Sequence, residues 1–167
     1  MTKEIAAYIA GFLDGDGSVR IQLQPRKNSF RVRTIISFAQ KWGKEKELQW
    51  IRNQLKIGYL YQRNDMITEL KIEGHKEVER ILRELKPYVL FKRKQVDLVL
   101  KILEMLKEGK ANLLEVAKLS DKISRLNYVT TKKKYTAQYL QKRLLSNTPV
   151  TTDPSDSEGE TSCFGKR

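Results

Sequence analysis

Hydrophobic residues recur at helical spacing near the start of the chain. Ile5, Ile9 and Leu13 lie four residues apart, and Thr2 precedes them as a residue type that caps helix N-termini. The chain then passes through Asp14-Gly-Asp-Gly-Ser, residue types that are typical of turns. The sequence therefore predicts a helix that ends in this turn.

A different spacing follows. Val19, Ile21 and Leu23 alternate with polar residues, which is typical of a strand with one buried face. The predicted strands are 18–25, 30–39, 57–63 and 67–73, and the predicted helices after the first are 44–55, 76–85, 94–107, 113–126 and 135–145. This order predicts an α+β fold with an αββαββα core. We expect a four-stranded, meander-like antiparallel sheet, helices on one of its faces, and extra C-terminal helices.

Polar side chains of the predicted strands fall on the face of the sheet away from the helices. This face comprises Ser18, Arg20, Gln22, Gln24, Arg26, Arg31, Arg33, Ser37, Tyr59, Tyr61, Arg63, Glu69 and Lys71. Such side chains hydrogen-bond base edges and phosphates, and a two-stranded ribbon fits the major groove of DNA. The pattern favours a DNA-reading surface over an ordinary solvated sheet face.

The charge balance supports nucleic acid as the partner. Lys and Arg number 33 against 20 Asp and Glu, which gives a net charge of +13. The Ser-, Thr- and Pro-rich stretch 148–167 carries four acidic and two basic residues. The positive charge therefore lies in residues 1–147, which we expect to form one domain ahead of a disordered polar tail. Within that domain we expect three consecutive lysines to contact phosphates: Lys132, Lys133 and Lys134.

The scarcity of two residue types excludes several function classes. One cysteine and one histidine exclude a disulfide framework, a multi-cysteine zinc site and chemistry that needs two histidines in one subunit. No apolar run approaches the roughly 18 residues of a membrane span, and no signal-peptide pattern opens the chain. We therefore expect an intracellular protein without a membrane partner.

The segment Ile9-Ala-Gly-Phe-Leu-Asp-Gly-Asp-Gly17 carries two glycines four residues apart. Gly11 and Gly15 lie on one face of a helix, where the missing Cβ atoms let a second backbone approach. Because the motif occurs once, we expect the same helix of a second subunit as its partner, with an interface of Ile9, Gly11, Phe12 and Gly15. Two-fold pairing would bring two Asp16 carboxylates together, which suits a hard divalent cation such as Mg²⁺.

This segment resembles the signature of the LAGLIDADG homing endonucleases. Five of its nine positions are identical to the motif and three more are apolar exchanges. The following hairpin, Gln40-Lys41 and Phe91-Lys-Arg-Lys-Gln95 are similar to single-motif members, so the resemblance covers residues 5–145. It implies a homodimeric endonuclease that lays a saddle-like sheet on a long, near-palindromic double-stranded DNA target and cuts both strands to leave short 3′ overhangs. It also implies a gene carried in an intron, for many members in a chloroplast or mitochondrion.

The resemblance further implies which residues act in cleavage. Asp16 and the backbone carbonyl of Gly15 match the positions that hold Mg²⁺, which Mn²⁺ would replace, whereas Ca²⁺ would support binding without cleavage. Gln40, Lys44 and Lys92 match positions that line the cleavage site, where they would orient the attacking water and stabilise charge on the phosphate. Asp14 matches a motif position without a ligand role, and we expect it to be structural.

Two alternatives belong to other classes. Some relatives of this fold bind DNA or assist the splicing of intron RNA without cutting, but the presence of Asp16 favours cleavage. The second alternative is a restriction-type nuclease built on Asp65 and the Glu69-Leu-Lys71 pattern, which occurs often by chance.

Overall fold

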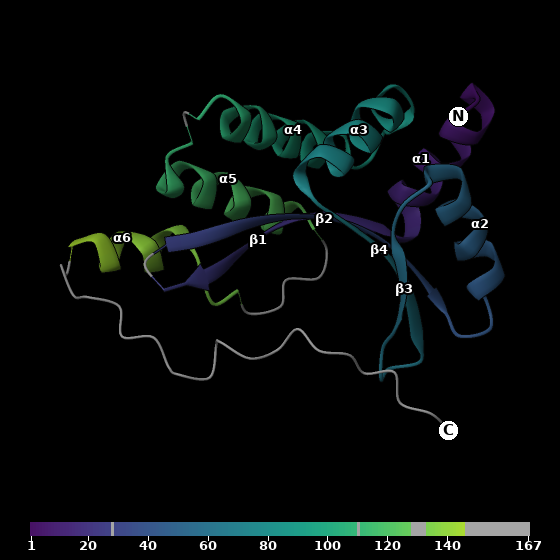
Figure 1. The fold of residues 1–167 in the computed structure, drawn as a ribbon, viewed down its shortest axis with the longest axis horizontal. Coiled ribbons are helices and arrows are strands. Elements are labelled where there is room, and N and C mark those ends of the chain that lie inside the picture. Colours follow the sequence, from purple (N-terminus) through teal and green to yellow (C-terminus); the bar gives the residue numbers. More distant parts are fainter. Residues whose placement is uncertain (28, 110, 128–132, 146–167) are drawn as a thin grey trace.

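The computed structural model describes residues 1–27, 29–109, 111–127 and 133–145, and they form an α+β fold (Figure 1). The predicted tail 148–167 and Lys132 lie outside the described residues. The elements in chain order are α1 (Lys3–Asp16), β1 (Gly17–Arg26), β2 (Ser29–Lys41), α2 (Glu45–Leu55), β3 (Tyr59–Gln62), β4 (Ile67–Glu73), α3 (His75–Leu85), the 3₁₀ turn η1 (Lys86–Tyr88), α4 (Arg93–Lys107), α5 (Leu113–Leu126) and α6 (Ala137–Leu145). The predicted αββαββα core and its additional C-terminal helices are confirmed.

The four strands form one antiparallel sheet, but they do not form a meander. Their spatial order is β1-β2-β4-β3, so β2 and β4 are the two central strands. The meander expectation was wrong because β2 is 13 residues long and serves two partners. Its first part pairs with β1 over 29–38, and its last part pairs with β4 over 35–41. The long β1–β2 hairpin and the short β3–β4 hairpin therefore extend from the sheet on different sides (Figure 1).

Helix α1 ends at Asp16, with Gly17 as its C-terminal cap residue. The prediction that the helix ends within Asp14-Gly-Asp-Gly-Ser is therefore confirmed, and Asp14 and Gly15 still belong to the helix. A Cβ atom on Gly17 would lie 2.6 Å from Leu13 Cδ1 and 2.7 Å from Leu13 Cα. A glycine is required at this position because the chain passes so close to the last turn of α1.

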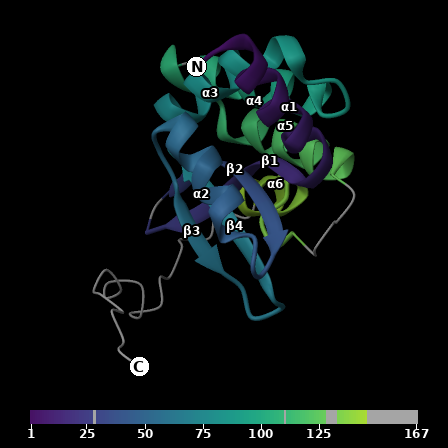
Figure 2. The same cartoon turned by 90° about the vertical axis from the view of Figure 1, so that its right-hand side faces the viewer.

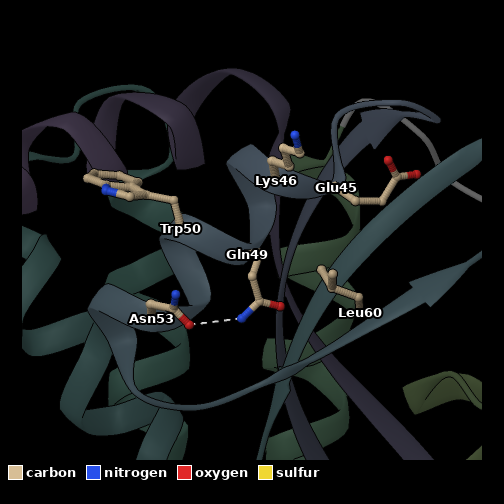
Figure 3. A pocket seen from close by; sticks show the side chains of 6 residues that line it. All are labelled: Glu45, Lys46, Gln49, Trp50, Asn53 and Leu60. Atoms are coloured by element: carbon tan, nitrogen blue, oxygen red, sulfur yellow. Dashed lines mark hydrogen bonds between the residues drawn. The ribbon is translucent and has the colours of Figure 1, made fainter.

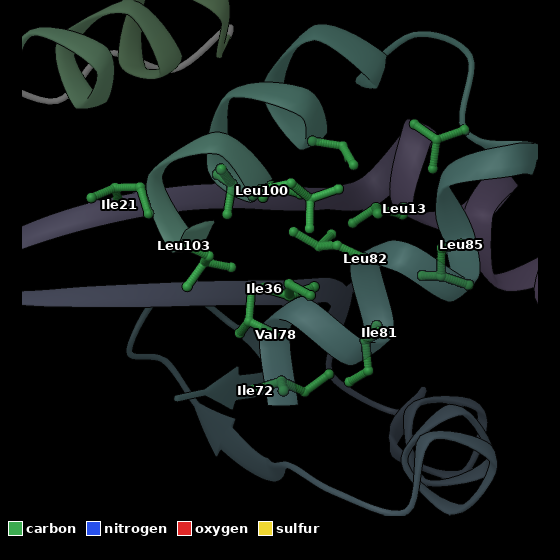
Figure 4. Close-up of a cluster of buried hydrophobic side chains, with 14 of the residues drawn as sticks. Leu13, Ile21, Ile36, Ile72, Val78, Ile81, Leu82, Leu85, Leu100 and Leu103 are labelled. Atoms are coloured by element: carbon green, nitrogen blue, oxygen red, sulfur yellow. The ribbon is translucent and has the colours of Figure 1, made fainter. Parts of the chain in front are cut away.

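The helices cover one face of the sheet and bury its apolar side chains. Ile36 of β2 and Ile72 of β4 meet Leu13 of α1, Leu82 of α3 and Leu100 of α4 in one continuous cluster (Figure 4). These side chains are almost fully buried, and burial of a Leu or Ile contributes roughly 1.5–3 kcal/mol. The α1 helix is thereby fixed to the end of the sheet with its C-terminal residues next to β1.

Figure 2 views the molecule from the side of α2, with helices above the strands. Helix α5 packs on β1, and the Ser120 hydroxyl donates a hydrogen bond of 3.0 Å to the carbonyl of Ile21. Leu140 of α6 joins the same core. None of the described helices is long and apolar enough to cross a membrane.

Candidate nucleic-acid interface and cleavage site

The strand register places the predicted polar positions on one face of the sheet. Gln22 lies opposite Arg33, and Gln24 lies opposite Arg31, on β1 and β2. Four further pairs join two predicted members of this face: Ser18 with Ser37, Ser37 with Lys71, Tyr59 with Lys71, and Tyr61 with Glu69. Directly opposite residues of an antiparallel pair share a face, so the predicted single surface is confirmed. Contact of that surface with DNA stays a prediction.

Two members of the predicted surface are buried. Ser37 lies beneath its neighbours and shares a hydrogen bond of 2.8 Å with the Ser18 hydroxyl. Glu69 is only 5% exposed. The alternation of side chains along the strands places both residues on the polar face, but the side chains of their neighbours cover them. A direct DNA contact by either residue therefore does not fit this structure, and Glu69 acts on the side chains around it.

Three cations surround the Glu69 carboxylate. Arg63 Nη1 lies 2.8 Å from Oε1, while Lys71 Nζ and Arg20 Nη2 lie 3.4 Å and 3.9 Å from Oε2. Burial raises the pKa of Glu69, but the hydrogen bond from Arg63 and the charges of Lys71 and Arg20 outweigh it and lower the pKa below its usual value. The carboxylate thus holds three candidate DNA-contacting cations in a fixed arrangement.

We expect Glu69→Gln to reduce stability near neutral pH by on the order of 1 kcal/mol, because Arg20 and Lys71 lose this counter-charge and Arg63 keeps only Asp65. Since the folded-state pKa of Glu69 is lowered, its contribution is present above the unfolded pKa near 4.5 and disappears as pH falls through the folded pKa. Urea unfolding followed by circular dichroism should show the wild type and the variant converging below pH 4.5. Glu104→Gln, an exposed change on α4, is the control. A difference that is equal at all pH values would contradict this role.

The cations around Glu69 also argue against the restriction-type alternative. Both oxygens of Glu69 face an ammonium or a guanidinium group. The two oxygens of Asp65 receive hydrogen bonds of 3.0 Å and 2.5 Å from the Arg63 guanidinium. A metal ion would have to displace these cations, so the structure does not support Asp65 and Glu69 as a metal site.

A second acidic residue orders the middle of the polar face. Arg33 Nη2 lies 2.5 Å from Glu73 Oε2, and the Tyr59 hydroxyl donates a hydrogen bond of 3.4 Å to Glu73 Oε1. Burial and the charge of Glu73 raise the pKa of Tyr59 above its usual value. Tyr59 therefore stays a neutral phenol that can still contact DNA. The Lys71 ammonium lies 3.9 Å from the centre of the Tyr61 ring, which fixes a second pair on this face.

One of the lysines before α6, Lys133, has a different role from the predicted phosphate contact. Lys133 Nζ lies 2.8 Å from both Ser120 Oγ and Asp121 Oδ1. Asp121 also accepts a hydrogen bond of 2.8 Å from the amide of Ala137, at the start of α6. Lys133 is thus engaged in attaching α6 to α5, so a primary role in phosphate contact does not fit. The Lys134 ammonium lies 5.6 Å from the centre of the Tyr135 ring and remains exposed.

This difference predicts distinct salt dependences. Arg26→Ala should reduce the slope of log K against log salt for duplex binding by about one, because Arg26 is exposed at the end of β1. Lys133→Ala should leave the slope unchanged, since its ammonium is already paired within the protein. Fluorescence anisotropy titrations at several salt concentrations measure both slopes. An equal reduction in the two variants would show that Lys133 leaves Asp121 to bind DNA.

The C-terminal end of α1 gathers most of the predicted cleavage residues. Gln40 at the end of β2 donates a hydrogen bond of 2.7 Å from Nε2 to Asp16 Oδ2. Lys92 approaches from the turn before α4, and its Nζ contacts the backbone carbonyls of Asp14 and Gly15, the latter at 3.3 Å. Residues separated by up to 78 positions therefore meet at one end of one helix.

Lys92 is an unusual lysine because it is only 7% exposed. Burial lowers the pKa of its ammonium, although the carboxylates of Asp14 and Asp16 act to raise it. The Gly15 carbonyl that faces this ammonium is the predicted metal ligand. A carbonyl oxygen has two lone pairs, so it can accept from this ammonium at 3.3 Å and still offer one to a metal ion, and the next residue is the exposed Asp16. These oxygen donors fit a hard divalent cation.

Lys44 lies at the N-cap position of α2. It shares with Gln40 a surface groove of about 680 Å³ that is also lined by Tyr8, Phe12 and Trp50. A neighbouring hollow of about 420 Å³ lies on the other side of α2, between Trp50 and Leu60 (Figure 3). The structure thus places Lys44 at the edge of the site.

The outward face of α1 agrees with only part of the predicted interface. Gly11 and Gly15 are exposed, and apart from the backbone of α1 itself no atom of the described residues lies within 4 Å of the position that a Cβ would take on either residue. Phe12 is half-buried and stacks on Phe38. Ile9 was assigned wrongly, because it is fully buried in the core of its own protomer.

Sequence reasoning missed three exposed apolar residues near the two glycines. Tyr8 is 62% exposed on α1, and Leu90 and Phe91 are 76% and 82% exposed beside the end of that helix. Tyr8 lies three and four residues before Gly11 and Phe12, so helical spacing alone would have placed it on their face. No local pattern places Leu90 and Phe91 there, because only the tertiary fold brings the turn before α4 to α1.

The family profile described as LAGLIDADG endonuclease matches residues 9–106. The chain belongs to the LAGLIDADG endonuclease family. This LAGLIDADG chain is 34% identical over 137 residues to DNA endonuclease I-CreI of Chlamydomonas reinhardtii, covering 78% of this chain and 83% of that protein. It is 33% identical over 125 residues to DNA endonuclease I-CvuI of Chlorella vulgaris, covering 72% and 78% of the two chains.

Solved structures extend the comparison of the LAGLIDADG chain to its fold. A crystal structure of homing endonuclease I-CvuI with its target and 2 mM Ca superposes with a TM-score of 0.77 at 30% identity, covering 84% of this chain and 92% of that one. The archaeal intron-encoded homing endonuclease I-Vdi141I complexed with DNA gives a TM-score of 0.72 at 18% identity, covering 84% and 94%, and shows the fold alone. The predicted fold class is thereby confirmed.

Proposed function

We propose that this LAGLIDADG chain is a site-specific homing endonuclease that hydrolyses both strands of double-stranded DNA with divalent metal ions. The observation that carries the proposal is the convergence of Asp16, Gln40 and Lys92 at the end of α1. They lie at one end of a sheet whose outer face carries arginines, glutamines and tyrosines of the kinds that read DNA. The relatives I-CreI and I-CvuI, which are DNA endonucleases by name, support the same reading.

Asp16 and the carbonyl of Gly15 would hold the metal. A bound Mg²⁺, or Mn²⁺ in its place, supplies charge stabilisation at the scissile phosphate. Gln40 holds the Asp16 carboxylate in place and can orient a water through its remaining amide atoms. Lys92 brings a desolvated positive charge next to the same carboxylate, where it can stabilise negative charge that develops on a phosphate oxygen.

A homodimer would complete this site. One protomer contributes one carboxylate and one carbonyl, fewer donors than the six or so oxygens that a hard divalent cation takes. The exposed glycine face of α1 would allow the same helix of a second copy to approach, and Tyr8, Leu90 and Phe91 would add apolar area around it. Two-fold symmetry would then place two copies of Asp16 together and two copies of the sheet along one near-palindromic target.

The proposal is tested by selecting a target and then asking for cleavage. Duplexes bound in Ca²⁺ are recovered from a randomised DNA pool, Mg²⁺ is added, and the ends of the products are sequenced. We expect a near-palindromic consensus with staggered cuts that leave short 3′ overhangs. A consensus that is bound but never cut would indicate a non-cleaving DNA-binding protein. A protein that selects no duplex but binds structured intron RNA would overturn the endonuclease assignment altogether.

A further inference from the structure

The two acidic residues near the end of α1 have different surroundings. Asp16 is exposed, and its carboxylate accepts a hydrogen bond from the side-chain amide of Gln40. The carboxylate of Asp14 instead accepts three backbone hydrogen bonds, from Leu90 at 2.6 Å, Phe91 at 3.2 Å and Lys92 at 2.9 Å. Since both oxygens of Asp14 are already used by amides, this residue is suited to hold the chain rather than a metal ion.

These three bonds fix the turn that precedes α4. Lys92 stands at the N-cap position of α4 but makes no side-chain cap bond of its own. Asp14, which lies 78 positions earlier in the chain, supplies the acceptor for amides at this helix start. A carboxylate at a helix N-terminus also interacts favourably with the helix dipole. The turn is therefore held to α1 through one side chain.

Asp14 and Lys92 hold each other in both directions, and we call this pair of residues the clamp. Lys92, whose amide is held by Asp14, sends its ammonium back to the carbonyls of Asp14 and Gly15 in the last turn of α1. Carbonyls at a helix C-terminus lack intrahelical partners and attract cations. A lysine side chain has high rotamer freedom, so an ordered ammonium at this place depends on a fixed backbone beneath it.

We propose that Asp14 is a positioning residue for phosphodiester cleavage, which fixes the turn at 90–92 so that Lys92 reaches the end of α1 beside Asp16. The inference rests on the proposed endonuclease function. The two acidic residues of the motif then have separate roles. Asp16 faces the metal and the phosphate, and Asp14 positions the side chain of Lys92. Charge stabilisation at a reacting phosphate depends on placement within about 0.5 Å, which a loose turn does not provide.

A double-mutant cycle tests whether Asp14 acts through Lys92. We expect Lys92→Ala to slow single-turnover cleavage by about 100-fold and Asp14→Ala by about 10- to 100-fold, with duplex binding in Ca²⁺ retained. The double variant should cut no more slowly than Lys92→Ala alone. If Asp14 acts only by placing Lys92, its removal has no further effect once the lysine is absent. Independent effects that multiply in the double variant would overturn the proposal.

A second measurement needs neither DNA nor metal. Acetylation of lysines by an N-hydroxysuccinimide ester, read by mass spectrometry, should find Lys92 protected in the wild type, where it is 7% exposed. Asp14→Ala should raise the acetylation rate of Lys92 by about 10-fold, while Asp97→Ala, which removes the partner of Lys86 on α4, should not. Unchanged protection of Lys92 in the folded Asp14 variant would overturn the clamp.

Two further outcomes are distinguishable. If Asp14→Ala does not fold by circular dichroism, Asp14→Asn keeps one acceptor oxygen and should give an intermediate acetylation rate; a rate equal to that of the wild type would count against the clamp. In the second outcome, the wild type cuts no duplex while Asp14→Ala still raises the acetylation rate of Lys92 as expected. The endonuclease function then fails, and the clamp between Asp14 and Lys92 has a structural role only.

Discussion

Replacing Asp16 by Asn should leave binding of the selected target intact and reduce cleavage by about a thousandfold or more. The amide oxygen of Asn can still accept the hydrogen bond from Gln40, which measures 2.7 Å in the wild type, so the local geometry survives. The negative charge that holds a hard cation is lost, and with it the charge stabilisation at the phosphate. Single-turnover assays in Mg²⁺ and anisotropy titrations in Ca²⁺ separate the two effects.

The matched control is Asp97→Asn, which changes an acidic residue on α4 that pairs with Lys86 and Arg93 and makes no contact with Asp16 in the described residues. It should cut at the wild-type rate. Undiminished cutting by Asp16→Asn would remove Asp16 from the metal site. If cutting were instead lost in Glu69→Gln and kept in Asp16→Asn, the restriction-type alternative on the β3–β4 hairpin would be correct, in spite of the three cations around Glu69.

Local periodicity was sufficient to predict most of the fold. Alternation at Val19, Ile21 and Leu23 defined β1, and helical spacing defined α1 and the later helices, because each pattern reflects one buried face. The pairing of β2 with β4 could not be obtained in this way. It depends on the length of β2 and on where its second half meets β4, which is a tertiary property.

The candidate site also has a part that the sequence predicts and a part that depends on tertiary contacts. Asp16 and Gly15 follow from a motif within one helix, and Gln40 and Lys92 follow from resemblance. The contacts that assemble them do not, because the amide of Lys92 and the carboxylate of Asp14 are 78 positions apart in the chain. The burial of individual charged side chains could not be predicted from the sequence pattern either. Glu69 and Lys133 have the position and charge expected of surface contacts, yet both pair with partners within the protein.

The outward face of α1 gives the second large effect. Gly11→Leu should convert a dimer into a 19.5 kDa monomer and abolish cleavage with it. Within the described part of one protomer the position is open, since no atom outside the backbone of α1 lies within 4 Å of the added Cβ. Leucine also favours a helix over glycine by up to about 1 kcal/mol, so the thermal stability of the isolated protomer should not fall. The clash arises only where a second helix backbone approaches this face.

Sedimentation velocity across a range of protein concentrations measures the change in mass, and circular dichroism measures the fold. Lys101→Leu, which adds an exposed leucine on α4 away from α1, is the control and should remain dimeric. Cleavage should disappear together with the dimer, because each protomer brings a single Asp16 to the site. A Gly11→Leu protein that stays dimeric and active would place the subunit contact elsewhere. The apolar residues Tyr8, Leu90 and Phe91 would then need another partner.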